Sequence, residues 1–194
     1  MIQEELENLP LSKYSFVNGS RRQAREKVMQ ILYCSEICEL PLEDIFKHIF
    51  FRSFNFGDSL KVPDKLLSPE EIYELEADIP IIWDDEEVQF AKDLIKIIFD
   101  NKESVTALID KFTEHWEMER IANIDRILMS IAVTEILYFE EIPTIVSINE
   151  AIEIAKKYST HKSGAFINGI LDQIHLKLKA DDKIKKSGRG LQEE

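Results

Sequence analysis

Apolar residues recur at intervals of three and four along most of the chain, which is the spacing of one face of an α-helix. The pattern predicts helices that begin near residues 21, 42, 84, 104, 121, 147 and 165, and a short helix after Ser68. No segment of useful length alternates between apolar and polar residues as a strand does. We therefore predict an all-α fold, a bundle of about seven or eight helices.

The stretch from Ile121 to Leu178 is expected to form the centre of this bundle. Its first helix has few polar positions, and Glu135 within it is expected to reach solvent or a backbone amide. The sequence from Ser147 to Glu150 matches a capping box, which predicts that the next helix starts at Ser147. Gly169 weakens the last helix, so we expect a neighbouring backbone to approach closely there.

Composition divides the chain into one helical domain with extensions. Residues 20–179 form the predicted domain, preceded by an N-terminal extension (1–19) and followed by a mobile basic tail (180–194). An acidic insertion at about 52–87 interrupts the domain, with ten carboxylates between Asp64 and Glu87. The net charge of −13 argues against a generic nucleic-acid binder, but nine Lys or Arg residues lie between Lys156 and Arg189.

Motifs for catalysis or metal binding are missing from the sequence. The four histidines form no metal-binding pattern, and the six glycines include no phosphate-binding loop. Cys34 and Cys38 have no further cysteine to complete a zinc site. Ser104 is expected to cap a helix. We predict a cytoplasmic protein that is not an enzyme, with no cofactor, no metal and no membrane-spanning segment.

The first predicted helix breaks a local rule. Ser20 fits a cap, but Arg21, Arg22 and Arg25 place positive charge in the first turns, where the helix dipole favours carboxylates. Tyr33 lies within about 20° of Arg22 around the helix and about 16 Å along it. Basic side chains with a nearby aromatic ring suit single-stranded RNA. A solvated charged face is the alternative on this helix alone.

Several blocks of sequence together resemble the bacterial NusB family of transcription antitermination factors. The blocks are Arg21-Arg-Gln-Ala-Arg-Glu26 with Leu32-Tyr33, Asp125-Arg-Ile-Leu128, Glu135-Ile-Leu, Ile142-Pro143, Ile148-Asn-Glu-Ala-Ile-Glu-Ile-Ala-Lys156 and Phe166-Ile-Asn-Gly-Ile-Leu-Asp172. The resemblance covers about residues 20–178 and is weakest between Cys38 and Glu87.

The resemblance implies a fold of two helical subdomains and a role in RNA binding. Members of the family bind the boxA element of nascent ribosomal RNA together with NusE, a small-subunit ribosomal protein. NusA, NusG and RNA polymerase complete the antitermination complex. Carried over to this chain, the implied RNA-binding residues are Arg21, Arg22, Arg25, Tyr33, Lys162 and Phe166. Asp125 and Arg126 are implied to lie at or near the NusE contact.

Two departures from the family pattern affect the implied RNA surface. Gln23 stands where the family often has an arginine, and Lys162-Ser-Gly-Ala stands where it often has Asp-Ser-His-Lys. Two alternative functions remain open on the sequence. One is a recruiting domain related to ribosomal RNA cytosine methyltransferases, and the other is a dimeric helical scaffold without RNA binding.

Overall fold

The computed structural model describes residues 17–51, 81–113 and 121–191, and within them the predicted all-α class is confirmed. These residues form seven α-helices, two two-residue strands and one 3-10 turn. The helices are α2 (Arg21–Ile37), α3 (Leu42–Phe51), α5 (Asp85–Asp100), α6 (Lys102–Thr113), α7 (Asn123–Tyr138), α8 (Thr144–Tyr158) and α9 (Ser163–Ala180). The strands are β1 (Val17–Asn18) and β2 (Ile81–Ile82), and the 3-10 turn is η2 (Gly188–Leu191).

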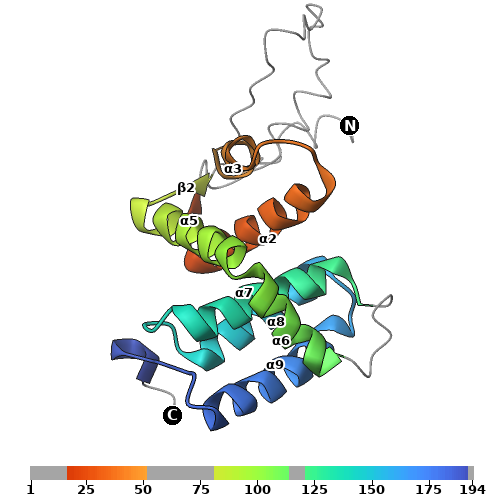
Figure 1. Cartoon of the computed structure of the whole chain (residues 1–194). Helices are drawn as coiled ribbons and strands as arrows, with labels where there is room; N and C mark the ends of the chain where they lie inside the picture. Colours follow the sequence, from red (N-terminus) through yellow and green to blue (C-terminus); the bar gives the residue numbers. More distant parts are fainter. Residues whose placement is uncertain (1–16, 52–80, 114–120, 192–194) are drawn as a thin grey trace, which may run out of the picture.

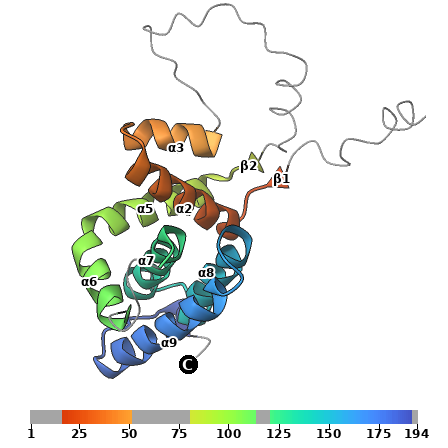
Figure 2. The ribbon, with the colours of Figure 1, turned by 90° about the vertical axis from the view of Figure 1, so that its right-hand side faces the viewer.

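The helices form two layers that meet at α7. The first layer holds α2, α3 and α5, and the second holds α6, α8 and α9 around α7 (Figure 1). Turned by 90°, the molecule shows α7 between α6 and α8, with α2 and α5 above it and α9 below (Figure 2). Ten of the 16 residues of α7 are buried, which explains why this helix has so few polar positions.

The start of α8 differs from the prediction. Pro143 occupies the N-cap position and the helix begins at Thr144, so Ser147 is the fourth helical residue. The Ser147 side chain is buried and its hydroxyl has no hydrogen-bond partner, so the predicted capping box is wrong. Proline suits the beginning of a helix because its missing N–H would have no intrahelical acceptor there. Glu150 is thereby free to contact another helix.

Two other local predictions are also wrong. A Cβ added at Gly169 would meet nothing within 4 Å, so no neighbouring backbone approaches this glycine closely. Helix α6 begins at Lys102, and the Ser104 hydroxyl donates to the carbonyl of Asn101 instead of capping the helix. The Ser20 cap is confirmed, since its hydroxyl accepts from the amide of Gln23 at 3.3 Å.

Residues on either side of the first layer, assigned by the sequence to the N-terminal extension and to the acidic insertion, pair with each other. Val17 and Asn18 of the N-terminal extension pair in parallel with Ile81 and Ile82, which the sequence assigned to the acidic insertion. Next to this pair, the indole N–H of Trp83 donates to the carbonyl of Phe50 at 3.1 Å. The other parts of the extension (1–16) and of the insertion (52–80) lie outside the described residues.

The basic segment after α9 packs against the domain instead of extending from it. The ammonium group of Lys186 donates to the carbonyls of Glu135 and Phe139 at the end of α7, at 3.1 and 2.9 Å. The amide of Ser187 donates to the carbonyl of Glu140 at 2.9 Å. A Cβ at Gly190 would lie 2.1 Å from that same carbonyl oxygen, so only glycine fits this approach. The described part of the predicted tail, residues 181–191, thus contacts the end of α7.

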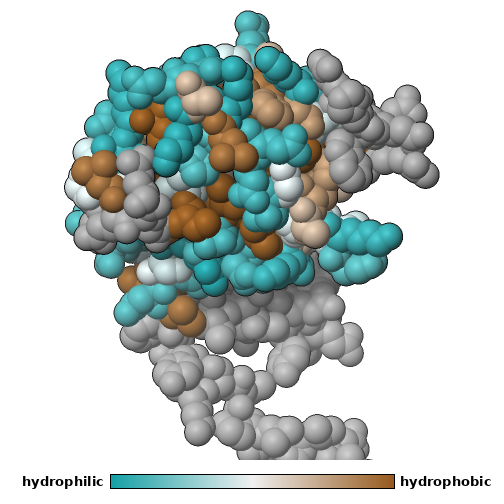
Figure 3. Space-filling model, turned by 90° about the horizontal axis from the view of Figure 1, so that it is seen from below, coloured by the Kyte–Doolittle hydropathy of each residue, from teal (hydrophilic) through white to brown (hydrophobic). Residues whose placement is uncertain are grey.

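Seen from the α9 side, hydrophilic residues cover most of the described surface and apolar residues appear between them (Figure 3). Large exposed apolar side chains of the second layer and of the C-terminal segment are Tyr138, Ile145, Leu176 and Leu191. Single exposed apolar residues are ordinary on a protein surface.

Candidate nucleic-acid interface

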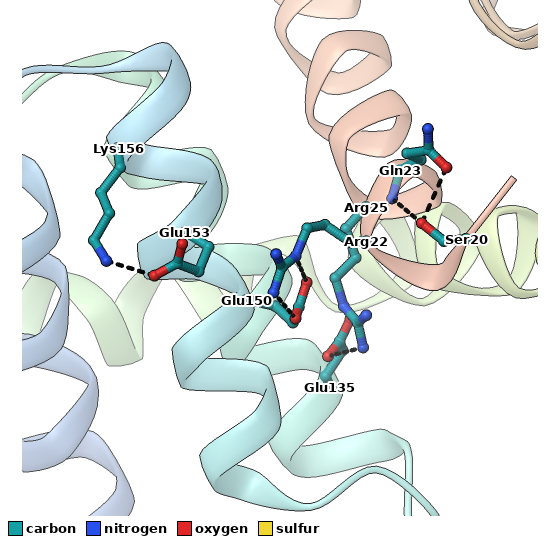
Figure 4. Close-up of polar contacts among 8 residues, drawn as sticks. All are labelled: Ser20, Arg22, Gln23, Arg25, Glu135, Glu150, Glu153 and Lys156. Carbon is teal, nitrogen blue, oxygen red and sulfur yellow. Dashed lines mark hydrogen bonds and ion pairs between the residues drawn. The ribbon is translucent and has the colours of Figure 1, made fainter. Parts of the chain in front are cut away.

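The arginines at the start of α2 point in different directions, and Arg25 points inward (Figure 4). Arg25 is only 4% exposed, and its Nε and Nη2 donate to the two carboxylate oxygens of Glu135 at 2.7 and 3.0 Å. Its guanidinium also lies 5.2 Å from the centre of the Phe90 ring. Arg21, Arg22 and Arg25 were predicted to form one RNA-binding cluster. For Arg25 this prediction is wrong, because its side chain is buried.

Glu135 explains why Arg25 is buried. This glutamate is 0% exposed in the middle of the molecule, so the expectation that it reaches solvent is also wrong. A carboxylate removed from water needs a charged partner with good geometry, and the bidentate arginine supplies it. Because Arg25 belongs to α2 and Glu135 to α7, the pair joins the two layers of the molecule.

Arg22 makes a pair of similar geometry at the surface. Its Nε and Nη2 donate to the carboxylate oxygens of Glu150 on α8 at 2.8 and 2.7 Å (Figure 4). The Arg22 side chain is 50% exposed. The hydrogen bond to Glu150 raises the pKa of Arg22, so this guanidinium stays charged at any physiological pH.

Arg22 is the first member of a row along α2 that faces α8. We call this row the polar stripe, and it consists of Arg22, Glu26, Gln30 and Tyr33. Intervals of four, four and three residues keep these side chains on one face of the helix. Tyr33 at the end of the stripe is 37% exposed, so the predicted exposed tyrosine is confirmed.

Side chains from the end of α8 bind the middle of the polar stripe. Glu26 accepts hydrogen bonds from Lys157 at 2.7 Å and from the Tyr158 hydroxyl at 2.9 Å, and Gln30 donates to the Tyr158 hydroxyl at 3.4 Å. Burial raises the pKa of Tyr158, and the bond to Glu26 raises it further. The carboxylate of Glu26 also raises the pKa of Lys157.

These contacts give the relative direction of the two helices. The middle of α8, at Glu150, meets the start of α2 at Arg22, and the end of α8 meets the middle of α2. The turn that follows α8 therefore lies beyond Tyr158, toward the Tyr33 end of the polar stripe. Lys162 in this turn is exposed, whereas Phe166 is half-buried and packs against the core.

Arg21 lies to the side of the polar stripe. Its guanidinium is 4.6 Å from the centre of the Phe90 ring, and its Nε is 3.7 Å from a carboxylate oxygen of Glu87 on α5. Stacking on an aromatic ring holds the flat guanidinium in place while leaving its edge in solvent. Arg21 thus remains available for an anionic ligand.

The residues predicted for a protein partner lie on another face. Asp125 is buried and one of its carboxylate oxygens has no hydrogen-bond partner, so this side chain does not present itself at the surface. Arg126 binds Asp110 at 2.9 Å and lines a groove of about 530 Å³ between the end of α2 and the starts of α6 and α7. Asn123 at the groove donates to Glu36 at 2.6 Å.

The sequence did not identify Glu26, Glu150, Lys157 and Tyr158 as members of this surface. The four-residue interval from Arg22 to Glu26 was the available signal, but the partners on α8 are more than 120 residues away in the chain. Within residues 17–51, 81–113 and 121–191 no group of three His, Cys, Asp or Glu side chains could hold a metal ion. No helix among them is long and apolar enough to cross a membrane.

The sequence is similar to known proteins of the NusB family. The sequence profile of the NusB family matches residues 22–176. The transcription antitermination protein NusB of Salinibacter ruber is 38% identical over 173 residues, which cover 89% of this chain and 91% of that protein. The NusB protein of Chloroherpeton thalassium is 37% identical over 172 residues, which cover 89% of this chain and 69% of that protein.

Solved structures support the same assignment. Thermotoga maritima NusB has a TM-score of 0.59 and 29% identity, covering 81% of this chain and 92% of that chain. A structure of the antitermination factors NusB and NusE in complex with dsRNA has a TM-score of 0.58 and 19% identity, covering 81% and 96%, which shows a shared fold. The resemblance to transcription antitermination factors is confirmed. The chain belongs to the NusB family of transcription antitermination proteins.

Proposed function

We propose that this protein binds boxA RNA together with NusE, using the polar stripe of α2 and the turn between α8 and α9. The observation that carries the proposal is that Arg22 and Tyr33, both exposed, lie on one face of α2, and that α8 leads toward this face. A solved structure with the same fold contains NusB and NusE with dsRNA, which supports the choice of partners.

Each exposed side chain has a chemical role in this proposal. The guanidinium groups of Arg21 and Arg22 bind phosphates, since their N–H groups match the spacing of two phosphate oxygens. The ring of Tyr33 stacks on an unpaired base, and Lys162 adds a positive charge beside it. Phe166 supports the turn from within, and Arg25 holds α2 against α7 instead of touching RNA.

We place the NusE contact at the groove beside Arg126. This groove lies on the side of α2 where Ser35 and Glu36 are found, and it combines apolar walls with the charged side chains of Lys102 and Arg126. Such a mixture is typical of a protein interface with a polar rim. Asp125 stabilises the beginning of α7 from inside, because a carboxylate favours the first turn of a helix.

The wider assembly follows from the family. We infer that the RNA-bound heterodimer with NusE joins NusA, NusG and RNA polymerase during transcription of ribosomal RNA in the cytoplasm. A homodimer that hides α2 would compete with this state.

The test is a titration of fluorescent boxA RNA and a scrambled RNA with the full chain, with and without NusE, over a series of salt concentrations. We expect tighter binding to boxA with NusE present, and weaker binding as salt rises because phosphate contacts release counterions. Equal binding of both RNAs, or no binding with NusE present, would refute the proposal. Sizing of the free protein at the same concentrations reports any homodimer, and a dimer that RNA does not dissociate would favour the scaffold alternative.

A further inference from the structure

In the free protein, carboxylates pair with most of the cations in and beside the proposed RNA surface. Arg22 of this surface and its neighbours Lys156 and Lys157 on α8 are each paired with a carboxylate. The partners are Glu150, Glu153 and Glu26, in that order. A surface that binds a polyanion gains from net positive charge, so this one-to-one pairing opposes the function proposed for it.

Glu150 occupies the part of Arg22 that a phosphate would use. Nε and Nη2 of the guanidinium donate to the two carboxylate oxygens at 2.8 and 2.7 Å, which is the bidentate geometry that arginine also offers to phosphate. The two anions therefore exclude one another from this edge. The Arg22 side chain is half-exposed, so a ligand can reach it from solvent.

Glu150 is also held in place more firmly than a typical surface carboxylate. Its side chain is 15% exposed, and it projects from α8, which packs along α7 and α9. The carboxylate does not need to be ordered when it binds Arg22, which makes it an effective competitor for the guanidinium.

We propose that Glu150 is an internal competitor for phosphate at Arg22, so that RNA binds by exchanging the carboxylate for a phosphate and Glu150 limits the affinity. This inference rests on the proposed function. Glu26 makes a comparable pair with Lys157, but it also accepts from Tyr158, so its replacement changes two contacts. Glu150 therefore gives the cleaner test.

The first experiment measures the affinity of the full chain with NusE for fluorescent boxA RNA at low salt, by anisotropy. We expect Glu150→Gln to bind about three- to fivefold tighter than the unchanged protein, the range expected for release of a partly exposed ion pair. Glu43→Gln is the matched control, because it removes the same charge from an ion pair with Lys47 on α3. We expect this control to leave the affinity unchanged.

The second experiment separates release of Arg22 from a general loss of repulsion. In the background of Arg22→Gln, the gain from Glu150→Gln should vanish, because no guanidinium remains to be released. A gain of equal size in that background would overturn the proposal, since it would report only the field of the carboxylate.

Other outcomes are equally decisive. If the unchanged protein binds RNA and Glu150→Gln binds no tighter than Glu43→Gln, or binds more weakly, the competitor role is refuted while the proposed function stands. If the unchanged protein with NusE does not bind boxA RNA, both fall. Circular dichroism of each variant confirms that the helices are retained.

Discussion

Two arginines of α2, three residues apart, make bidentate pairs with glutamates under opposite conditions. Arg25 and Glu135 are buried between α2 and α7, whereas Arg22 and Glu150 meet at the surface between α2 and α8 (Figure 4). The donor and acceptor atoms are of the same kind and the distances are similar. The two pairs differ in burial and not in geometry. The buried pair stabilises the fold, whereas a ligand can replace the carboxylate in the exposed pair.

The largest effect is expected from breaking the buried pair. Arg25→Ala leaves the carboxylate of Glu135 without its partner in the core, which should lower the free energy of unfolding by about 3–5 kcal/mol. Urea denaturation followed by circular dichroism measures this loss. Arg25→Met combined with Glu135→Leu should recover much of it, because no charge is then left buried. A loss below about 1 kcal/mol for Arg25→Ala would contradict the role assigned to this pair.

The next largest loss of stability is expected from removing Lys186, which binds the end of α7. Lys186→Met removes two hydrogen bonds to the carbonyls of Glu135 and Phe139, and should lower the free energy of unfolding by about 1–3 kcal/mol. Lys185→Met is the matched control, since this neighbouring lysine is exposed. Equal urea midpoints for the two variants would show that the C-terminal segment does not stabilise α7.

A smaller effect on stability is expected at the exposed pair. Arg22→Gln should change the free energy of unfolding by less than about 1 kcal/mol, because solvent screens this ion pair. The same variant should weaken boxA binding and reduce the slope of log affinity against log salt by about 0.7 to 1, the loss of one phosphate contact. If Arg22→Gln lowered the free energy of unfolding as much as Arg25→Ala does, the two pairs would not differ in their contribution to stability.

The smallest effect lies in the middle of the polar stripe. Glu26→Gln should lower the pKa of Tyr158, because it removes the carboxylate that accepts a hydrogen bond from the neutral phenol and repels the phenolate. Ultraviolet titration at high pH, as a difference from Tyr158→Phe, measures this pKa among the five tyrosines of the chain. An unchanged pKa would mean that burial alone accounts for the shift.

Periodicity predicted the fold because each helix buries one regular face. The starts of α2 and α3, the central position of α7 and the all-α class followed from spacing alone. The start of α8 did not, because Ser147 matched a local motif while Pro143, four residues earlier, offered an equally good beginning. Local capping rules could not choose between them without knowing that Ser147 faces the core.

The candidate site was predictable only in part. Exposure of Arg22 and Tyr33 followed from helical geometry. The inward turn of Arg25 had a signal in the sequence, since it precedes Met29 and Leu32 at intervals of four and seven residues on a buried face. Its partner Glu135 lies 110 residues away, so the pair itself could not be read from local pattern.

The indole of Trp83 can serve as a fluorescence probe of one layer of the molecule. It packs against Phe50 with the two rings tilted by 44° and their centres 4.7 Å apart, in the layer formed by α2, α3 and α5. The chain has one other tryptophan, Trp116, outside the described residues. In a Trp116→Phe variant, intrinsic fluorescence would follow the melting of that layer alone, and comparison with total helicity would reveal whether both halves of the molecule unfold in one cooperative step.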